Sequence, residues 1–149
     1  MRRYQHEVIV STSAEKLYRA LSDVTHWPRW DEGIESVEVE RAGADGEGAA
    51  LAPGAPFVLK PRGGPRVAMT VEAACAPTRF VDLAHLPLAK MRTSHELLAT
   101  EGGGGTRVRI VIEVFGPLAF LWDRLVARGQ AAGCEAQTHA LAAYAEQRS

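Results

Sequence analysis

Seven segments of the chain alternate between apolar and polar residues, which is the pattern of β-strands with one buried face. In the first segment, Arg3–Ser11, the residues Tyr4, His6, Val8 and Val10 alternate with Gln5, Glu7 and Ile9. The other six segments are 34–41, 57–60, 66–74, 79–86, 90–100 and 106–115. Turn residues separate them, so we expect consecutive hairpins and an antiparallel sheet.

Two short helices are predicted directly after the first strand. Thr12 followed by Glu15 matches a capping box, which predicts a helix from about Ser13 to Asp23. The next segment, 23–30, predicts a second short helix or a turn, and Pro28 interrupts it.

The last segment, from Gly116 to about Arg148, predicts one long helix with an unusual inner stripe. Successive helical residues are rotated by about 100°, which brings eight positions close to one line. The stripe consists of Leu118, Trp122, Leu125, Gly129, Ala132, Ala136, Ala140 and Ala143. Gly129 and Gly133 each cost a helix about 1 kcal/mol relative to alanine. Small residues here either let another backbone approach closely or leave space beneath the helix, and the second option predicts a cavity.

This order of elements predicts an α+β fold in a single domain spanning residues 1–149. The composition fits, with 46% hydrophobic and 23% charged residues. The net charge of -1 gives no general attraction to nucleic acid or to an anionic membrane, so nucleic-acid binding is not expected. We find no signal segment and no apolar stretch long enough to cross a bilayer.

Cys75 and Cys134 are far apart and fit no metal or redox spacing. We therefore expect a reduced, cytoplasmic setting, with no metal and no cofactor. Edge-strand pairing could make a homodimer, but nothing in the sequence requires it, so a monomer or a homodimer is expected.

The alternation of inward and outward residues along each strand predicts which side chains line the cavity. On 90–100, the polar residues at alternate positions put Met91, Thr93 and His95 on the inner face. The full set is Val67, Met69, Val71, Leu83, His85, Met91, Thr93, His95, Val108, Ile110, Ile112, Leu125, Gly129, Ala132 and Ala136. Trp27 and Trp30 either cover the entrance or simply pack on the sheet, and Trp122 either fills one end or contacts a ligand.

His95 is the main candidate for acid–base chemistry, because a partly buried histidine can titrate near neutrality. An inward histidine is also a common hydrogen-bonded core residue, and both interpretations stay open. His85 would line the same pocket if Val81, Leu83 and His85 face inward. A slip of one residue would put Asp82 there instead.

Four phrases carry a resemblance to a known superfamily. They are Ala-Glu-Lys-Leu at 14–17, the Asp–Pro–Trp segment 23–30, Gly-Gly-Thr-Arg-Val at 104–108 and Gly-Pro-Leu at 116–118. In this order the chain resembles the SRPBCC superfamily, also called START-like or helix-grip. It is most similar to the bacterial polyketide cyclase/dehydrase and lipid-transport branch. The resemblance implies a seven-stranded curved sheet around a long C-terminal helix, with a deep apolar cavity between them.

Three functions remain open. The first is binding of a hydrophobic small molecule, such as a lipid, polyketide or isoprenoid, by area burial with a few polar groups to orient it. The second is a cyclase or aromatase of polyketides in the same cavity, for which His95, Thr93 and Tyr18 are the candidate catalytic residues. The third is a protein-interaction module, which predicts an exposed apolar patch and a filled interior.

Overall fold

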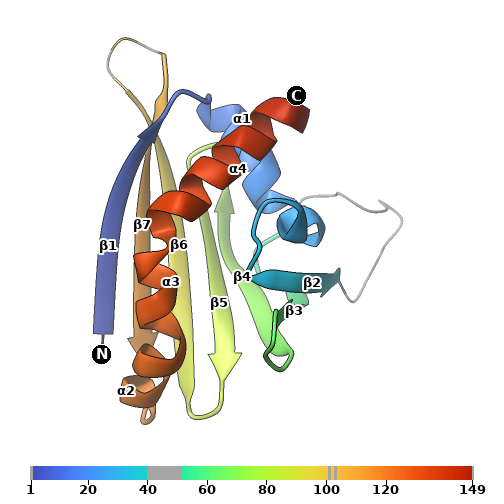
Figure 1. Ribbon diagram of the computed structural model, residues 1–149, viewed down its shortest axis with the longest axis vertical. Coiled ribbons are helices and arrows are strands. Elements are labelled where there is room, and N and C mark those ends of the chain that lie inside the picture. Colours follow the sequence, from blue (N-terminus) through green and yellow to red (C-terminus); the bar gives the residue numbers. More distant parts are fainter. Residues whose placement is uncertain (1, 40–51, 101, 103, 149) are drawn as a thin grey trace.

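The computed structural model describes residues 2–39, 52–100, 102 and 104–148. Within them, seven strands form one curved antiparallel sheet in the order β1-β7-β6-β5-β4-β3-β2 (Figure 1). The strands are β1 (Arg2–Val10), β2 (Ile34–Val39), β3 (Pro56–Pro61), β4 (Val67–Cys75), β5 (Arg79–Leu86), β6 (Ala89–Ala99) and β7 (Thr106–Phe115). The predicted end of the second strand at 40–41 and the turn at 43–48 lie outside the described residues.

The helices lie on one face of this sheet, which confirms the α+β, helix-grip arrangement (Figure 1). Two follow β1, namely α1 (Ala14–Ser22) and the 3₁₀ helix η1 (Val24–Arg29). The C-terminal part comprises α2 (Ala119–Trp122), the π-helical turn η2 (Asp123–Ala127), α3 (Arg128–Ala132) and α4 (Cys134–Arg148). The predicted single long helix is therefore interrupted at η2 and again at Gly133.

The N-cap of α1 is Ser13, one residue later than the capping box predicted. The Ser13 hydroxyl accepts a hydrogen bond from the backbone N–H of Lys16 at 3.3 Å. Thr12 is buried instead, and its hydroxyl donates to the carbonyl of Ala142 at 3.4 Å. Thr12 therefore joins the start of α1 to α4.

Trp27 is the centre of an aromatic cluster that fixes η1 on the sheet. Its ring meets those of Phe57, Phe80 and Trp30 edge to face, with centroids 5.7, 6.4 and 6.4 Å away. The indole N–H of Trp27 donates to the Leu21 carbonyl at 2.8 Å. Trp27 and Trp30, the two predicted entrance tryptophans, are both buried in the hydrophobic core.

The predicted inner stripe of the C-terminal helix is wrong by one to two residues. Leu125, Gly129, Ala132 and Ala136 are exposed, and a Cβ added at Gly129 would meet nothing within 4 Å. The face that is buried consists of Ala119, Asp123, Ala127, Ala131, Cys134, Thr138, Leu141, Ala142 and Ala145. Gly129, Ala132 and Ala136, the small residues of the predicted stripe, therefore do not face the sheet.

Two polar residues explain the error. Asp123 and Thr138 belong to the buried stripe, although a hydrophobicity pattern assigns such residues to the surface. The Tyr4 hydroxyl donates to the Asp123 carboxylate at 2.6 Å, and the Thr138 hydroxyl donates to the Cys134 carbonyl at 2.7 Å. Because these bonds satisfy both side chains, the helix can turn them inward and leave Leu125 outside.

Candidate functional site

Three polar side chains lie together on the concave face of the sheet. Asp82 on β5 is directly opposite Thr93 on β6, and Thr93 is opposite Ile112 on β7. Directly opposed residues in an antiparallel pair project to the same face, with Cβ atoms about 5 Å apart. His95 follows Thr93 by two residues, so it shares this face. We call Asp82, Thr93 and His95 the polar trio.

The register of β5 corrects one part of the sequence prediction. Phe80, Asp82 and Ala84 face inward, whereas Leu83 and His85 belong to the convex face. His85 is exposed, and its Nε2 lies 2.7 Å from the Thr70 hydroxyl. The cause is Phe80, whose ring joins the aromatic cluster on the concave side. His85 and His95 therefore do not share a pocket.

Burial shifts the pKa values of the two titratable residues of the trio, Asp82 and His95. Asp82 is 6% exposed and His95 8% exposed. Burial lowers the pKa of His95 to about 4, so its imidazole is neutral near pH 7. Burial, with a smaller contribution from the Glu72 charge, raises the pKa of Asp82 to about 7. Near neutral pH the site thus holds a neutral histidine and a carboxyl group that is about half protonated.

Two atoms of the trio have no hydrogen-bond partner within the described chain. They are Thr93 Oγ1 and His95 Nδ1, and Trp30 Nε1 is in the same condition. Buried polar groups in native proteins are nearly always hydrogen-bonded, since leaving one unsatisfied costs about 1–3 kcal/mol. Sequence reasoning placed Thr93 and His95 inward, but it did not indicate that their polar atoms lack protein partners.

Tyr18, the third candidate catalytic residue, is buried on α1. Its ring meets that of Phe80 edge to face at 6.3 Å, which places it above the β5 end of the trio's face. Burial and the nearby Cys75 raise the pKa of Tyr18 above its ordinary value. The phenol therefore keeps its proton and can donate a hydrogen bond, but it is a poor base.

Apolar side chains surround the trio on the concave face. Of the predicted lining, those that face inward are Val67, Met69, Val71, Met91, Val108, Ile110 and Ile112. On β7 the exposure of Ile110 and Ile112 is 1% or less, whereas Met69 and Met91 keep 6–7%. Trp122 is half-buried at the far end, where its indole N–H donates to the Pro87 carbonyl at 2.9 Å. Leu125, Gly129, Ala132 and Ala136 do not join this face.

The C-terminal helix covers this face unevenly. α4 packs mainly against α1 and β1, and η2 packs against β7 (Figure 1). α1 in turn contacts β5 and β6. The β7 side of the concave face is thus tightly filled, while the side chains of the trio and the two methionines next to it keep a small residual exposure.

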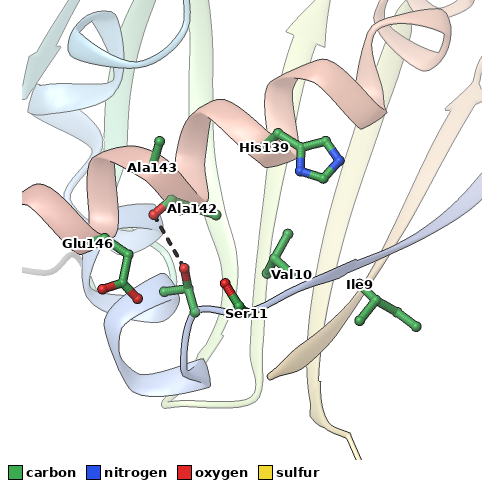
Figure 2. A pocket seen from close by; sticks show the side chains of 8 residues that line it. Ile9, Val10, Ser11, His139, Ala142, Ala143 and Glu146 are labelled. Atoms are coloured by element: carbon green, nitrogen blue, oxygen red, sulfur yellow. Dashed lines mark hydrogen bonds between the residues drawn. The ribbon is translucent and has the colours of Figure 1, made fainter. Parts of the chain in front are cut away.

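Two surface hollows lie away from the polar trio. Figure 2 shows the first, of about 300 Å³, between the end of β1 and α4. It is lined by Ile9, Val10, Ser11, Thr12, His139, Ala142, Ala143 and Glu146. The second, of about 420 Å³, lies on the convex face between Glu72, Arg79, Arg92 and Glu113. There Arg92 forms ion pairs with Glu72 at 2.6 Å and with Glu113 at 3.6 Å. The guanidinium charge of Arg92 is therefore already paired within the protein.

The described residues do not bring potential metal ligands together. Among the residues that the structure describes, no group of three or more His, Cys, Asp or Glu side chains could hold a metal ion. In the same part of the chain, no helix has the length and apolar character needed to span a bilayer.

Several solved structures have the same fold at low sequence identity. A hypothetical protein from Helicobacter pylori is 16% identical, with 97% of this chain and 88% of that chain covered and a TM-score of 0.76. A START superfamily protein from Mycobacterium smegmatis is 16% identical over 99% of both chains, with a TM-score of 0.67. The Zhui aromatase/cyclase from Streptomyces sp. R1128 is 16% identical, with 99% and 94% covered and a TM-score of 0.70. At such identity the likeness establishes the fold alone.

No curated protein matches the sequence. The family described as polyketide cyclase/dehydrase and lipid transport, however, matches residues 1–146, which is nearly the whole chain. This agrees with the helix-grip topology and with the START-like structural neighbour. The chain therefore belongs to the polyketide cyclase/dehydrase and lipid transport family, within the SRPBCC superfamily that its sequence resembles.

Proposed function

We propose that this protein binds a hydrophobic small molecule, of the lipid, polyketide or isoprenoid type, against the concave face of β4–β6. The observation that carries the proposal is the polar trio in its apolar surroundings. Thr93 Oγ1 and His95 Nδ1 are buried without protein partners among the described residues, although partners are the rule for such atoms. A ligand that supplies hydrogen bonds there removes this cost.

The surroundings of the trio favour a ligand that is mostly apolar. Met69, Met91 and Ile112 offer flexible and branched apolar surface, and each Å² of apolar area buried contributes about 25 cal/mol. Since His95 is neutral and Asp82 is about half protonated near pH 7, the trio favours a hydroxyl or carbonyl group over a strongly charged one. The family's description, which names both cyclases and lipid transport, supports the same ligand class.

The site differs from the one expected from the sequence. The expected cavity was bounded by the small residues of the C-terminal helix, and these face solvent. The proposed site instead lies on the concave face of β4–β6, where α1 contacts β5 and β6 and Trp27 of η1 meets Phe80 of β5. Binding there requires side chains such as Met69 and Met91 to shift, which their unbranched chains allow at low cost.

The direct test is a thermal-shift screen with fatty acids, isoprenoids and aromatic polyketides, followed by native mass spectrometry of each stabilising compound. A Thr93→Val variant removes a hydroxyl at nearly constant volume, and it should weaken binding of the ligand roughly tenfold. Thr70→Val on the convex face of β4 is the matched control and should leave binding unchanged. If no compound stabilises the protein, or if Thr93→Val and Thr70→Val bind alike, the proposal is wrong.

The alternative function is a cyclase or aromatase-type enzyme, and one observation favours it. Asp82, with a pKa of about 7, can exchange a proton near neutral pH while facing the same space as Thr93 and His95. General acid–base groups act best when their pKa lies near the working pH. This version of the proposal predicts that Asp82→Asn lowers kcat on a poly-β-ketone substrate at least about 100-fold without preventing ligand binding. Full turnover by Asp82→Asn would remove the catalytic role.

A further inference from the structure

Exposed apolar side chains gather at one end of the molecule. Leu88 lies in the tight turn between β5 and β6, while Phe120 and Leu121 belong to α2 and Leu125 to η2. Their exposed fractions run from 37% for Leu121 to 67% for Leu88. We call these four residues the apolar tip. Figure 1 shows α2 and the β5–β6 turn together at the lower end of the sheet.

Two hydrogen bonds hold the turn and the helix of the apolar tip together. The backbone N–H of Leu118 donates to the Leu88 carbonyl at 3.0 Å. The indole N–H of Trp122 donates to the Pro87 carbonyl at 2.9 Å. The apolar tip is therefore fixed in place and does not depend on a partner to assemble it.

Leu88 also adopts an unfavourable backbone conformation. Its φ is +55°, in the left-handed region, at the second central position of a Pro-Leu turn where glycine is the usual residue. Leucine thus adds both strain and exposed apolar area without burying its side chain in the protein. A contact outside the protein explains such a residue better than the stability of the fold does.

Basic residues border the apolar tip. Arg2, Lys90, Arg124 and Arg128 are all exposed at this end. Two of these four, Arg2 and Arg128, pair with the carboxylate of Asp123, which is 2% exposed, at 4.0 and 3.6 Å. One carboxylate cannot neutralise four cations. This end is therefore positively charged, although the whole chain has a net charge of -1.

We propose that this end of the molecule docks onto the surface of an anionic lipid bilayer. The apolar tip would enter the boundary between headgroups and acyl chains, and the four basic residues would contact anionic headgroups. Protruding apolar side chains with a cationic border match an interface that is apolar inside and negatively charged outside. A second copy of this chain would bring its own four cations against these, so self-association is disfavoured. The proposal does not depend on the ligand of the concave face.

The test is co-sedimentation of the full chain with vesicles of phosphatidylcholine alone and of phosphatidylcholine mixed with phosphatidylglycerol, at low and at high salt. We expect binding to the mixed vesicles at low salt and weaker binding at high salt. The double variants Phe120→Ser/Leu125→Ser and Lys90→Glu/Arg124→Glu should each bind at least about tenfold more weakly, since each loses two contributions to binding. All four positions are exposed, so the fold should persist, which thermal unfolding checks.

The chain offers a matched control at its opposite end. Ile9 on β1 is 61% exposed and lies directly opposite the exposed Arg107 on β7. The double variant Ile9→Ser/Arg107→Glu removes one apolar side chain and reverses one charge, but it should bind vesicles like the wild type. Three results would overturn the proposal: no binding to anionic vesicles, equal loss in the control, or light scattering that shows a dimer which Phe120→Ser/Leu125→Ser dissociates.

Discussion

Asp82 and Thr93 face each other across the β5–β6 pair, and both side chains project from the concave face of the sheet. Asp82 is 6% exposed and Thr93 4%. A carboxylate in such a place is destabilised relative to the neutral acid, which is why the pKa of Asp82 rises to about 7. The protein therefore holds a group whose ionisation opposes folding, and this has a measurable consequence.

The first prediction concerns Asp82→Asn. In the unfolded chain Asp82 ionises above its ordinary pKa of 3.8, but in the folded protein only above about 7. Between these values the folded state binds more protons, so the Asp82 contribution makes wild-type stability fall as the pH rises. Asparagine does not titrate. The free energy of unfolding of the variant minus that of the wild type should therefore increase by roughly 4 kcal/mol from pH 4 to pH 8.

Urea denaturation at several pH values measures this difference. Glu32→Gln, which removes an exposed carboxylate, reports the effect of changing the net charge alone. A difference for Asp82→Asn that stays level across this range would mean that the carboxyl group is not desolvated, and the acid–base version of the function would lose its support.

The second prediction concerns His95→Phe and has the opposite sign. The pKa of His95 is about 4 in the folded protein and ordinarily 6.5, so between these values the unfolded chain binds the additional proton. The His95 contribution to stability is complete above pH 6.5 and is lost as the pH falls towards 4. As the pH falls from 6.5 to 4, the free energy of unfolding of the variant minus that of the wild type should therefore increase by roughly 3 kcal/mol.

Asp82 and His95 oppose each other between pH 4 and 6.5, so the wild-type stability curve alone conceals both. Comparison of each single variant with the wild type separates them. An NMR titration of the His95 ring gives an independent reading, because the midpoint of its signal shifts should lie near pH 4. Protonation of His95 near its ordinary pKa would contradict the buried placement of the trio.

The strand pattern predicted much of the fold. The bounds of β5 and β7 agree with the sequence expectation, because clear turn residues flank each alternating run. Faces were harder to predict than bounds. On β5, Val81 and Leu83 are more apolar than Asp82, so hydrophobicity alone selects the wrong face. Phe80 decides the register through long-range contact with Trp27, which a local pattern does not contain.

Strand alternation also predicted part of the candidate site. Thr93 and His95 lie between Met91 and Leu97 on a strand whose alternate residues are polar, so their inward orientation followed from parity. The buried face of the C-terminal helix, in contrast, could not be predicted from its sequence. In α4 the apolar residues occur on all sides, as in the run 140–145, so its sequence specifies no single buried face. The inward turn of Asp123 depends on Tyr4, which is 119 residues away.

The third prediction tests this Tyr4–Asp123 contact. Tyr4→Phe removes the hydroxyl that donates to Asp123 at 2.6 Å and leaves a buried carboxylate with fewer hydrogen bonds. We expect a loss of about 1–3 kcal/mol in the free energy of unfolding. In an Asp123→Ala background the same change should cost much less, as a double-mutant cycle would show. Equal cost in both backgrounds would mean that Tyr4 acts through packing and not through this hydrogen bond.

The fourth prediction concerns Gly129, the residue that first suggested a cavity beneath the helix. Gly129 is exposed on α3, and an added Cβ meets nothing within 4 Å. Gly129→Ala should therefore stabilise the protein by about 0.5–1 kcal/mol through its higher helix propensity, and it should leave ligand-induced thermal shifts unchanged.

Gly116→Ala provides the contrast for this last prediction. Gly116 has a φ of +113°, and a Cβ there would lie 2.9 Å from the Cα of Ala89, so backbone atoms would have to move. We expect this variant to be destabilised by more than about 1 kcal/mol, and calorimetry of both variants measures the difference. If Gly129→Ala instead weakened ligand binding, Gly129 would line the site after all, and the buried stripe through Asp123 and Thr138 would have to be abandoned.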